Sequence, residues 1–301
     1  MYDITSIYQA QSADDAIAAL RADPSAVVIA GGTDVLIKCR EGKLAGCRLV
    51  SIHELQEELA GVHLDDSGDV RIGSLTTFRG VTYSDVIRKT VPVLGEAADT
   101  AGGPQLRAAG TIGGNVCNGV TSADTASTLM ALDAQMHVKG PDGWRIIPIG
   151  AWYQGVGKVA LAHDELLMQI VIPKAHYAGW SGHYIKYAQR NAMDIATIGC
   201  AAAVRLDGTV ISGIRLAYSV SAPIPVRCPS AEAAALGRSA TPEALPATLA
   251  AISAAVEADV QPRTSWRANR DFRMHIIRTL AERVIARCVV RAVELQEAAS
   301  C

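Results

Sequence analysis

Aromatic side chains, excess charge and long apolar runs are all scarce in this chain of 301 residues. Phe, Trp and Tyr together make up 5% of it, and its formal net charge at pH 7 is −2. Binding to nucleic acid or to an anionic membrane requires basic surfaces, and single strands also require stacking rings, so we expect neither partner. Runs such as "VVIA" and "QIVI" are too short to span a membrane, and "MYDITSIYQAQSADD" lacks the pattern of a secretory signal. The sequence therefore predicts a cytoplasmic protein.

Metal-binding motifs are also missing. The seven cysteines are scattered and include no CxxC pair, and the seven histidines include no HxH or HExxH pair. Such spacings suit neither a thiolate cage for zinc or an iron–sulfur cluster nor a disulfide framework. If the protein carries out redox chemistry, its own side chains are not expected to hold a metal for it.

The N-terminal part of the chain has an α/β pattern. Half of all residues are hydrophobic, which is enough for two or three domains with cores of their own. Ser12 precedes an amphipathic stretch and has Asp15 three residues on, which predicts a capped helix. A buried strand is expected at "AVVIA", a tight turn at "GGTD", a helix at "VLIKCREGKL" and a second strand at "CRLVSI".

The middle of the chain has an α+β pattern, and the last part changes again. Two hairpins are expected, one turning at Ser67-Gly68 and the other at Asp142-Gly143. Helices are expected over 78–100 and from Asp124 onward, a loop over 151–165, and a strand at "LLMQIVIP". Composition shifts at about 175–180, where a meander of strands begins, with a turn at Asp207-Gly208, followed by an Ala-rich helical end. We therefore expect an α+β protein.

Three short motifs are candidates for a binding site. "GVGKVA" at 155–160 matches the dinucleotide fingerprint GxGxxA, but it leads toward a strand rather than a helix, which argues against that fold. "AGGTD" and "TIGGN" each leave an apolar run through Gly-Gly and continue with small polar residues. Glycines let backbone amides approach and converge on a phosphate, but they also make ordinary turns. The pattern alone leaves both readings open.

Several charged residues have two readings each. Lys186 suits a surface position on a strand or a place beside a cofactor anion. Asp124 suits a helix cap, and Asp194 a turn. The C-terminal segment is rich in arginine, with Trp266 and Phe272 among them. A helix there would present a basic face, either solvated or in contact with another protein.

Four stretches, taken together and in order, carry a resemblance to a known family. They are "AGGTD", "AGGPQLRAAGTIGGNVCNGVTSAD", "KYAQRNAMDIATIGCAA" and "PRTSWRANRDFR". They resemble the FAD-binding subunit of molybdenum hydroxylases, most of all the middle subunit of bacterial three-subunit xanthine dehydrogenases. The resemblance covers essentially the whole chain.

The resemblance implies a domain organisation. An FAD-binding domain of the vanillyl-alcohol-oxidase/PCMH type is expected over 1–176, with a small α/β lobe at about 1–58 and a larger α+β lobe at 59–176. A C-terminal α+β domain of the CO-dehydrogenase-flavoprotein type, a strand meander plus helices, is expected over 177–301. FAD is expected between the two lobes, with the C-terminal domain over its flavin side.

The resemblance also implies which residues contact FAD. It implies a first loop at the pyrophosphate, made of Val27, Val28, Ile29, Ala30, Gly31, Gly32, Thr33 and Asp34. It implies a second loop, made of Thr111, Ile112, Gly113, Gly114 and Asn115. Asp124 matches the family's flavin-contacting carboxylate, Leu167 an apolar contact that a one-residue shift would give to Met168, and Lys186 the lysine near the cofactor. The stretch 195–198 is expected beside the isoalloxazine ring.

The implied function is electron transfer through FAD. A purine would be hydroxylated at a molybdopterin centre in a large partner, and electrons would reach FAD through [2Fe–2S] centres in a small partner. Reduced FAD would then pass hydride to NAD⁺, with no side chain of this chain acting as a catalytic acid or base. No extra cluster is expected here, because no cysteine-rich insertion is present. The alternatives are the FAD subunit of a carbon monoxide dehydrogenase or aromatic hydroxylase, a stand-alone flavin reductase, and a cofactor-free assembly subunit.

Overall fold

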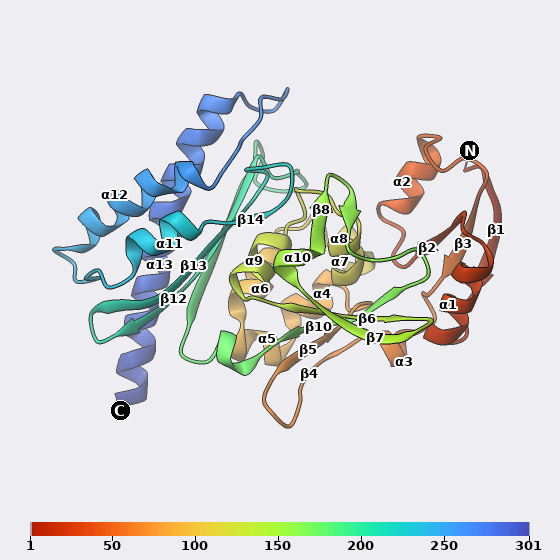
Figure 1. The fold of residues 1–301 in the computed structure, drawn as a ribbon, viewed down its shortest axis with the longest axis horizontal. Helices are drawn as coiled ribbons and strands as arrows, with labels where there is room; N and C mark the ends of the chain where they lie inside the picture. The colour runs from red at the N-terminus through yellow and green to blue at the C-terminus, as the bar shows by residue number, and fades with distance from the viewer. Residues whose placement is uncertain (1, 301) are drawn as a thin grey trace.

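The protein folds as three parts that follow one another along the chain and lie side by side in Figure 1. The computed structural model describes residues 2–300, and the side chains of residues 2–298. The N-terminal part lies at the right of the figure, the central part in the middle and the C-terminal part at the left. The expected α+β class is confirmed.

The N-terminal part is a parallel sheet with helices beside it. The strands β1 (Ile4–Gln9), β3 (Cys47–Ser51) and β2 (Ala26–Ile29) lie in the order β1-β3-β2, and the helices are α1 (Ala13–Ala22), α2 (Val35–Arg40) and α3 (Gln56–Leu59). Ser12 caps α1 as predicted, because its hydroxyl accepts a hydrogen bond from the Asp15 amide at 3.1 Å. Strand β1 was not expected, since its side chains are largely exposed and give no apolar pattern.

The central part is built on a five-stranded antiparallel sheet. Its strand order is β4 (Val62–Leu64), β5 (Val70–Gly73), β10 (Leu166–Ile172), β6 (Gln135–Gly140) and β7 (Gly143–Pro148). Both predicted hairpins are confirmed by the pairing of β4 with β5 and of β6 with β7. The stretch 78–100 is helical as predicted and is divided into three helices: α4 (Phe78–Tyr83), α5 (Asp85–Thr90) and α6 (Pro92–Asp99). The breaks arise because Ser84 caps α5 and Pro92 starts α6.

Three local predictions in the central part are wrong. The second glycine motif forms a helix, α8 (Ile112–Cys117), and follows helix α7 (Pro104–Ala109). Helix α9 (Ala126–Ala131) begins after Thr125, so Asp124 does not cap it. The expected loop over 151–165 contains the hairpin of β8 (Tyr153–Gly155) and β9 (Lys158–Val159), which follows α10 (Ile149–Trp152). "GVGKVA" lies in this hairpin, which agrees with the argument against a dinucleotide fold.

The C-terminal part is a four-stranded antiparallel sheet covered on both faces by helices. Its strands are β11 (Ser181–Tyr187), β12 (Ile198–Asp207), β13 (Val210–Ser219) and β14 (Val226–Arg227), after the 3-10 helix η1 (Lys174–His176). Helix α13 (Arg270–Ser300) packs on β11 and β12, and α11 (Pro229–Ala235) packs on β13 and on α12 (Leu245–Ala255). Helices α6 and α9 of the central part contact the same sheet. The predicted domain division after residue 176 falls at the end of η1 and stays a prediction.

Ion pairs tie the C-terminal part to the central part. Glu96 on α6 accepts hydrogen bonds from His183 Nδ1 at 2.9 Å and from the Tyr184 amide at 3.1 Å, and it pairs with Arg291 on α13 at 2.6 Å. A carboxylate that joins three elements fixes their relative positions more firmly than apolar contact alone. No helix in the described part of the chain is both long and apolar enough to cross a membrane.

Candidate functional site

A cavity of about 780 Å³ lies where the three parts meet. Residues of the β2–α2 loop form one wall, residues of α7 and α8 another, and residues 193–195 from the loop between β11 and β12 reach its mouth. This volume is within the usual range for sites that enclose a large small-molecule ligand. Of the predicted site residues, thirteen line it: Val27, Val28, Ala30, Gly31, Gly32, Thr33, Asp34, Thr111, Gly113, Gly114, Asn115, Asp124 and Leu167.

The first glycine motif offers free backbone donors to the cavity. Gly32 has φ +72°, a left-handed conformation that glycine adopts without strain. The amide groups of residues 31–34 donate to no acceptor in the described part of the chain. Unpaired amides in succession are costly unless water or a ligand accepts from them. This loop is therefore suited to an anionic group such as a phosphate.

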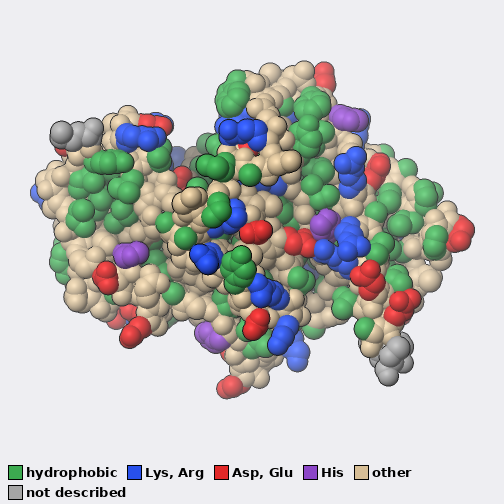
Figure 2. Space-filling model, turned by 180° about the vertical axis from the view of Figure 1, so that it is seen from behind, with side chains coloured by type: hydrophobic (Ala, Val, Ile, Leu, Met, Phe, Trp, Pro, Cys, Tyr) green, Lys and Arg blue, Asp and Glu red, His purple; other side chains and the backbone are tan. Residues whose placement is uncertain are grey.

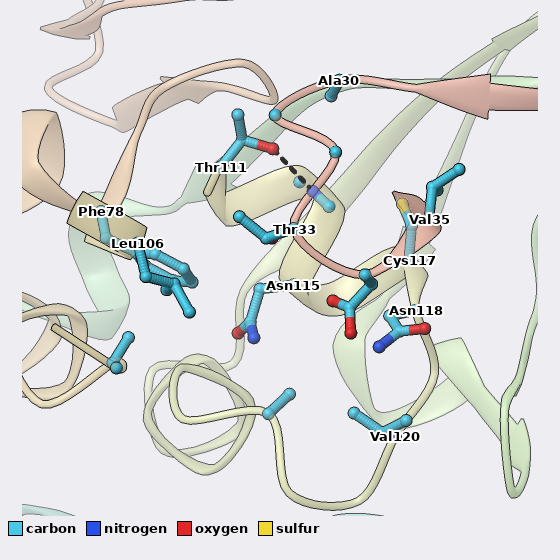
Figure 3. Close-up of a pocket in the computed structure, with 18 of the residues that line it drawn as sticks. Ala30, Thr33, Val35, Phe78, Leu106, Thr111, Asn115, Cys117, Asn118 and Val120 are labelled. Atoms are coloured by element: carbon cyan, nitrogen blue, oxygen red, sulfur yellow. Dashed lines mark hydrogen bonds between the residues drawn. The ribbon is translucent and has the colours of Figure 1, made fainter. Parts of the chain in front are cut away.

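The second glycine motif presents a different surface. Thr111 caps α8, with its Oγ1 accepting from the Gly114 amide at 3.0 Å (Figure 3). The amides of Ile112 and Gly113 donate to the carbonyls of Thr76 and Ser74, both at 2.9 Å. Its first amides are therefore already bonded, so this motif does not offer free amides to the cavity as the first motif does. What this motif offers instead is space on its cavity side, because a Cβ on Gly114 would meet one other atom within 4 Å, Thr111 Oγ1 at 3.0 Å.

The glycines also permit close backbone contacts, between the lobes at Gly31 and within the central lobe at Gly113. A Cβ on Gly31 would lie 1.8 Å from the carbonyl oxygen of Ala109 on α7, and one on Gly113 would lie 2.6 Å from that of Ser74. Lys38 Nζ on α2 donates to Asn118 Oδ1 just beyond α8 at 2.7 Å. The two glycine motifs therefore lie on neighbouring walls of one cavity because no side chains separate the backbones.

A buried ion pair lies at one side of the cavity. Asp124 Oδ1 is 2.9 Å from Lys186 Nζ, which also donates to the carbonyl of Thr100 at 3.0 Å. Burial raises the pKa of Asp124 to about 6, although Lys186 and the neighbouring Tyr184 hydroxyl oppose the shift. Lys186 is therefore no surface lysine. It does not line the cavity and acts on it through Asp124.

Apolar side chains cover much of the remaining wall. Figure 3 shows Phe78 and Leu106 on one side and Val120 on another. Leu167 lines the cavity, whereas Met168 packs into the core of the N-terminal part, so of the two only Leu167 faces the site. A ligand here would contact polar backbone at one end and hydrocarbon elsewhere, as large ring-bearing ligands do.

Some predicted residues lie elsewhere, and some lining residues were missed. Ile112 is fully buried in the core, and Ile29 lines a smaller cavity of about 210 Å³ across the loop. Within 195–198 only Ile195 lines the main cavity. The missed residues are Ser74, Leu75, Phe78, Gly102, Gly103, Leu106, Asn118 and Ser122, among others. Ser74, Leu75 and Phe78 come from a segment that meets the motifs only in the folded chain, whereas the other five lie within the quoted stretch 101–124, so the motif itself could have identified them. No group of three or more His, Cys, Asp or Glu residues among those described is arranged to hold a metal.

Two family models match the chain. The model of the FAD binding domain in molybdopterin dehydrogenase matches residues 3–175. The model of the CO dehydrogenase flavoprotein C-terminal domain matches residues 183–288. The first match contains both glycine motifs and Asp124, and the second contains Lys186 and most of α13.

Several characterised proteins are similar to this chain over nearly the whole of its length and of their own. The xanthine dehydrogenase FAD-binding subunit of Escherichia coli O157:H7 is 42% identical over 292 residues, which are 97% of this chain and 98% of that protein. The carbon monoxide dehydrogenase medium chain of Hydrogenophaga pseudoflava is 29% identical over 284 residues, 92% of this chain and 96% of that one. A chain in a solved structure of carbon monoxide dehydrogenase from H. pseudoflava superposes with a TM-score of 0.90 at 27% identity, covering 97% of this chain and 99% of that chain.

Proposed function

Since the chain belongs to the family of FAD-binding subunits of molybdopterin dehydrogenases, we propose that it is the FAD subunit of a xanthine dehydrogenase complex of the cytoplasm. The observation that carries the proposal is the run of unpartnered amides at 31–34, facing a cavity with a mainly apolar wall. FAD combines an anionic pyrophosphate with two large ring systems, so the donors and the apolar wall both have a counterpart in the cofactor. The residues present therefore fit the group.

We assign roles to the predicted residues as follows. The amides of Gly31 to Asp34 bind the pyrophosphate, and the open face of Gly114 gives it room. Val27, Val28, Ala30, Thr33, Thr111, Asn115 and Leu167 shape the cavity around the cofactor. Ile29 and Ile112 hold the two motifs in place from the core side. Asp124 and Lys186 lie together at the proposed flavin end.

The Asp124–Lys186 pair sets the charge at that end of the cavity. At pH 7 the pair is close to neutral, and when Asp124 takes up a proton the lysine charge is left uncompensated. Bound FAD supplies the chemistry of collecting single electrons and releasing a pair as hydride to NAD⁺. The chain itself would bind and orient FAD and keep water away from it, with Leu106, Met193 and Ile195 bordering the mouth of the cavity.

The partners follow from the same proposal. The iron–sulfur and molybdopterin centres would be in separate subunits, because the relatives of this chain are themselves FAD-binding or medium chains of larger dehydrogenases. A purine is the proposed substrate of the large partner, supported by the 42% identity to a xanthine dehydrogenase subunit against 29% to a carbon monoxide dehydrogenase chain. The second candidate, a carbon monoxide dehydrogenase subunit, has the TM-score of 0.90 in its favour.

The test is an assay of the purified complex. We expect FAD to co-purify with it and xanthine to reduce NAD⁺ at a rate that depends on this chain. Oxidation of carbon monoxide but not of xanthine would favour the second candidate. Xanthine oxidation that reduces only dyes or oxygen would refute the assignment of NAD⁺.

A further inference from the structure

The mouth of the cavity borders an exposed surface that is both apolar and basic. We call it the rim patch: Leu106, Arg190, Met193, Ile195, Arg263, Trp266, Arg267, Arg270 and Phe272. Trp266 is 78% exposed, more than any other large hydrophobic side chain that the structure describes, and Met193 is 66% exposed. Exposed apolar side chains that gather in one place mark binding surfaces far more often than scattered ones do.

The rim patch is continuous with the cavity. Leu106, Met193 and Ile195 line the mouth, and Met193 packs beside Gly103. Gln189 Nε2 donates to the Arg267 carbonyl at 3.1 Å, which ties the loop between β11 and β12 to the segment 259–269. That segment crosses the top of the molecule in Figures 1 and 2, where hydrophobic and basic side chains lie next to one another.

Buried hydrogen bonds hold the patch in shape. Arg273, which is 2% exposed, donates to the Thr197 carbonyl and, at 2.8 Å, to Ser265 Oγ. The ring of Phe272 packs edge-on against Tyr187 at 5.9 Å. A surface that is already ordered loses little conformational entropy when it binds.

The arginines of the C-terminal segment do not form one basic face. Arg273 is buried, Arg278 pairs with Glu257, and Arg291 pairs with Glu96. By contrast, Arg263, Arg267 and Arg270 have no carboxylate within salt-bridge distance in the described part of the chain, and Arg267 stacks over Trp266 at 4.3 Å. Asp194 is mostly buried and accepts from two backbone amides of its own loop. Of the four arginines of the rim patch, Arg190 lies 3.8 Å from Asp194, so the unpaired positive charge of the patch comes from the other three.

We propose that the rim patch docks the subunit that delivers electrons to the cofactor in the cavity, a protein with carboxylates around a shallow apolar pocket for Trp266. The inference rests on the proposed function. Electron transfer weakens steeply with distance, so the donor must dock beside the mouth. Trp and Arg dominate the energetic centres of interfaces, and opposite charges on the two surfaces speed and orient docking.

The test compares two triple variants in the co-expressed complex. The rim variant is Arg263→Glu, Trp266→Ala and Arg270→Glu. The matched control is Trp144→Ala, Arg283→Glu and Arg287→Glu, which removes another exposed tryptophan and reverses two exposed arginines elsewhere. We expect the rim variant to bind the iron–sulfur partner at least about tenfold more weakly, and the control to bind it as the wild type does. Circular dichroism of each variant checks the fold, and the single Trp266→Ala variant serves if the triple variant is misfolded.

Three results would overturn the inference. They are normal partner binding by the rim variant, an equal loss in the control, and a raised KM for NAD⁺ with normal partner binding, which would make the patch a dinucleotide site. The FAD content of the wild-type complex is measured separately. A complex without FAD whose assembly still depends on the rim patch would refute the proposed function and leave the docking surface standing.

Discussion

At the scale of single residues, the glycines of the two motifs have distinct tasks. Gly31 and Gly113 permit contact between backbones, Gly32 permits a left-handed turn, and Gly114 leaves space in the cavity. The sequence placed all four at one site but could not separate these tasks, because the neighbours at Ala109 and Ser74 come from other elements.

Gly114→Val tests the space that the cavity keeps for a ligand. Gly114 faces the cavity, so the added methyl groups should exclude cofactor while the fold is kept. Overpacking of this kind costs about 1–3 kcal/mol, which corresponds to about a 5- to 150-fold loss of FAD affinity. Fluorescence titration with FAD would measure it. Gly150→Val is the control, since a Cβ there meets nothing within 4 Å, and equal affinity in both variants would contradict the assignment.

Asp124 gives the protein a predictable dependence on pH. Its pKa is raised from 3.8 to about 6 in the folded chain. The folded protein therefore holds a proton that the unfolded chain releases over this interval, so the contribution of Asp124 to the free energy of unfolding falls as pH rises from about 4 to about 6. Urea unfolding of the wild type and of Asp124→Asn across this range checks it. The free energy of unfolding of the wild type minus that of Asp124→Asn should fall as pH rises from about 4 to about 6. A difference that stays constant or rises with pH would contradict the raised pKa of Asp124.

At the scale of elements, apolar periodicity predicted some helices and strands correctly and missed others. It predicted α1, the two central hairpins and β10, because their apolar residues face one core at a regular spacing. It missed α8, whose two glycines disfavour a helix but whose Thr111 cap and contacts to Ser74 and Thr76 stabilise it. It does not show where 78–100 divides, which depends on the Ser84 cap of α5 and on Pro92 at the first position of α6.

Helix α6 is expected to be the main link between the central and C-terminal parts. Glu96→Ala removes the acceptor shared by His183, Tyr184 and Arg291, and a hydrogen bond to a charged group is worth about 1.5–3 kcal/mol. We expect the free energy of unfolding measured in urea to fall by about 1.5–3 kcal/mol in total, because the partners are partly exposed and water replaces some of the lost bonds. Glu41→Ala, which breaks an exposed pair with Lys43, is the control and should be unchanged. A loss in the control as large as that in Glu96→Ala would contradict the proposed link.

At the scale of the whole molecule, the cavity exists only because three parts of the chain meet. Its walls come from residues as distant as Val27 and Ile195. Sequence motifs identified two of the walls, and the resemblance to a family supplied the order of the parts. The Arg-rich segment around Trp266 was already a candidate contact surface in the sequence, but the apolar wall and the place of that segment beside the cavity emerged only from the packing of distant helices and loops.

The central claim is that this cavity binds FAD, and the flavin content of the purified complex tests it most directly. The account predicts visible flavin absorption and one FAD per copy of this chain, released on denaturation and lost in Gly114→Val but not in Gly150→Val. A colourless complex that takes up no added FAD would contradict it.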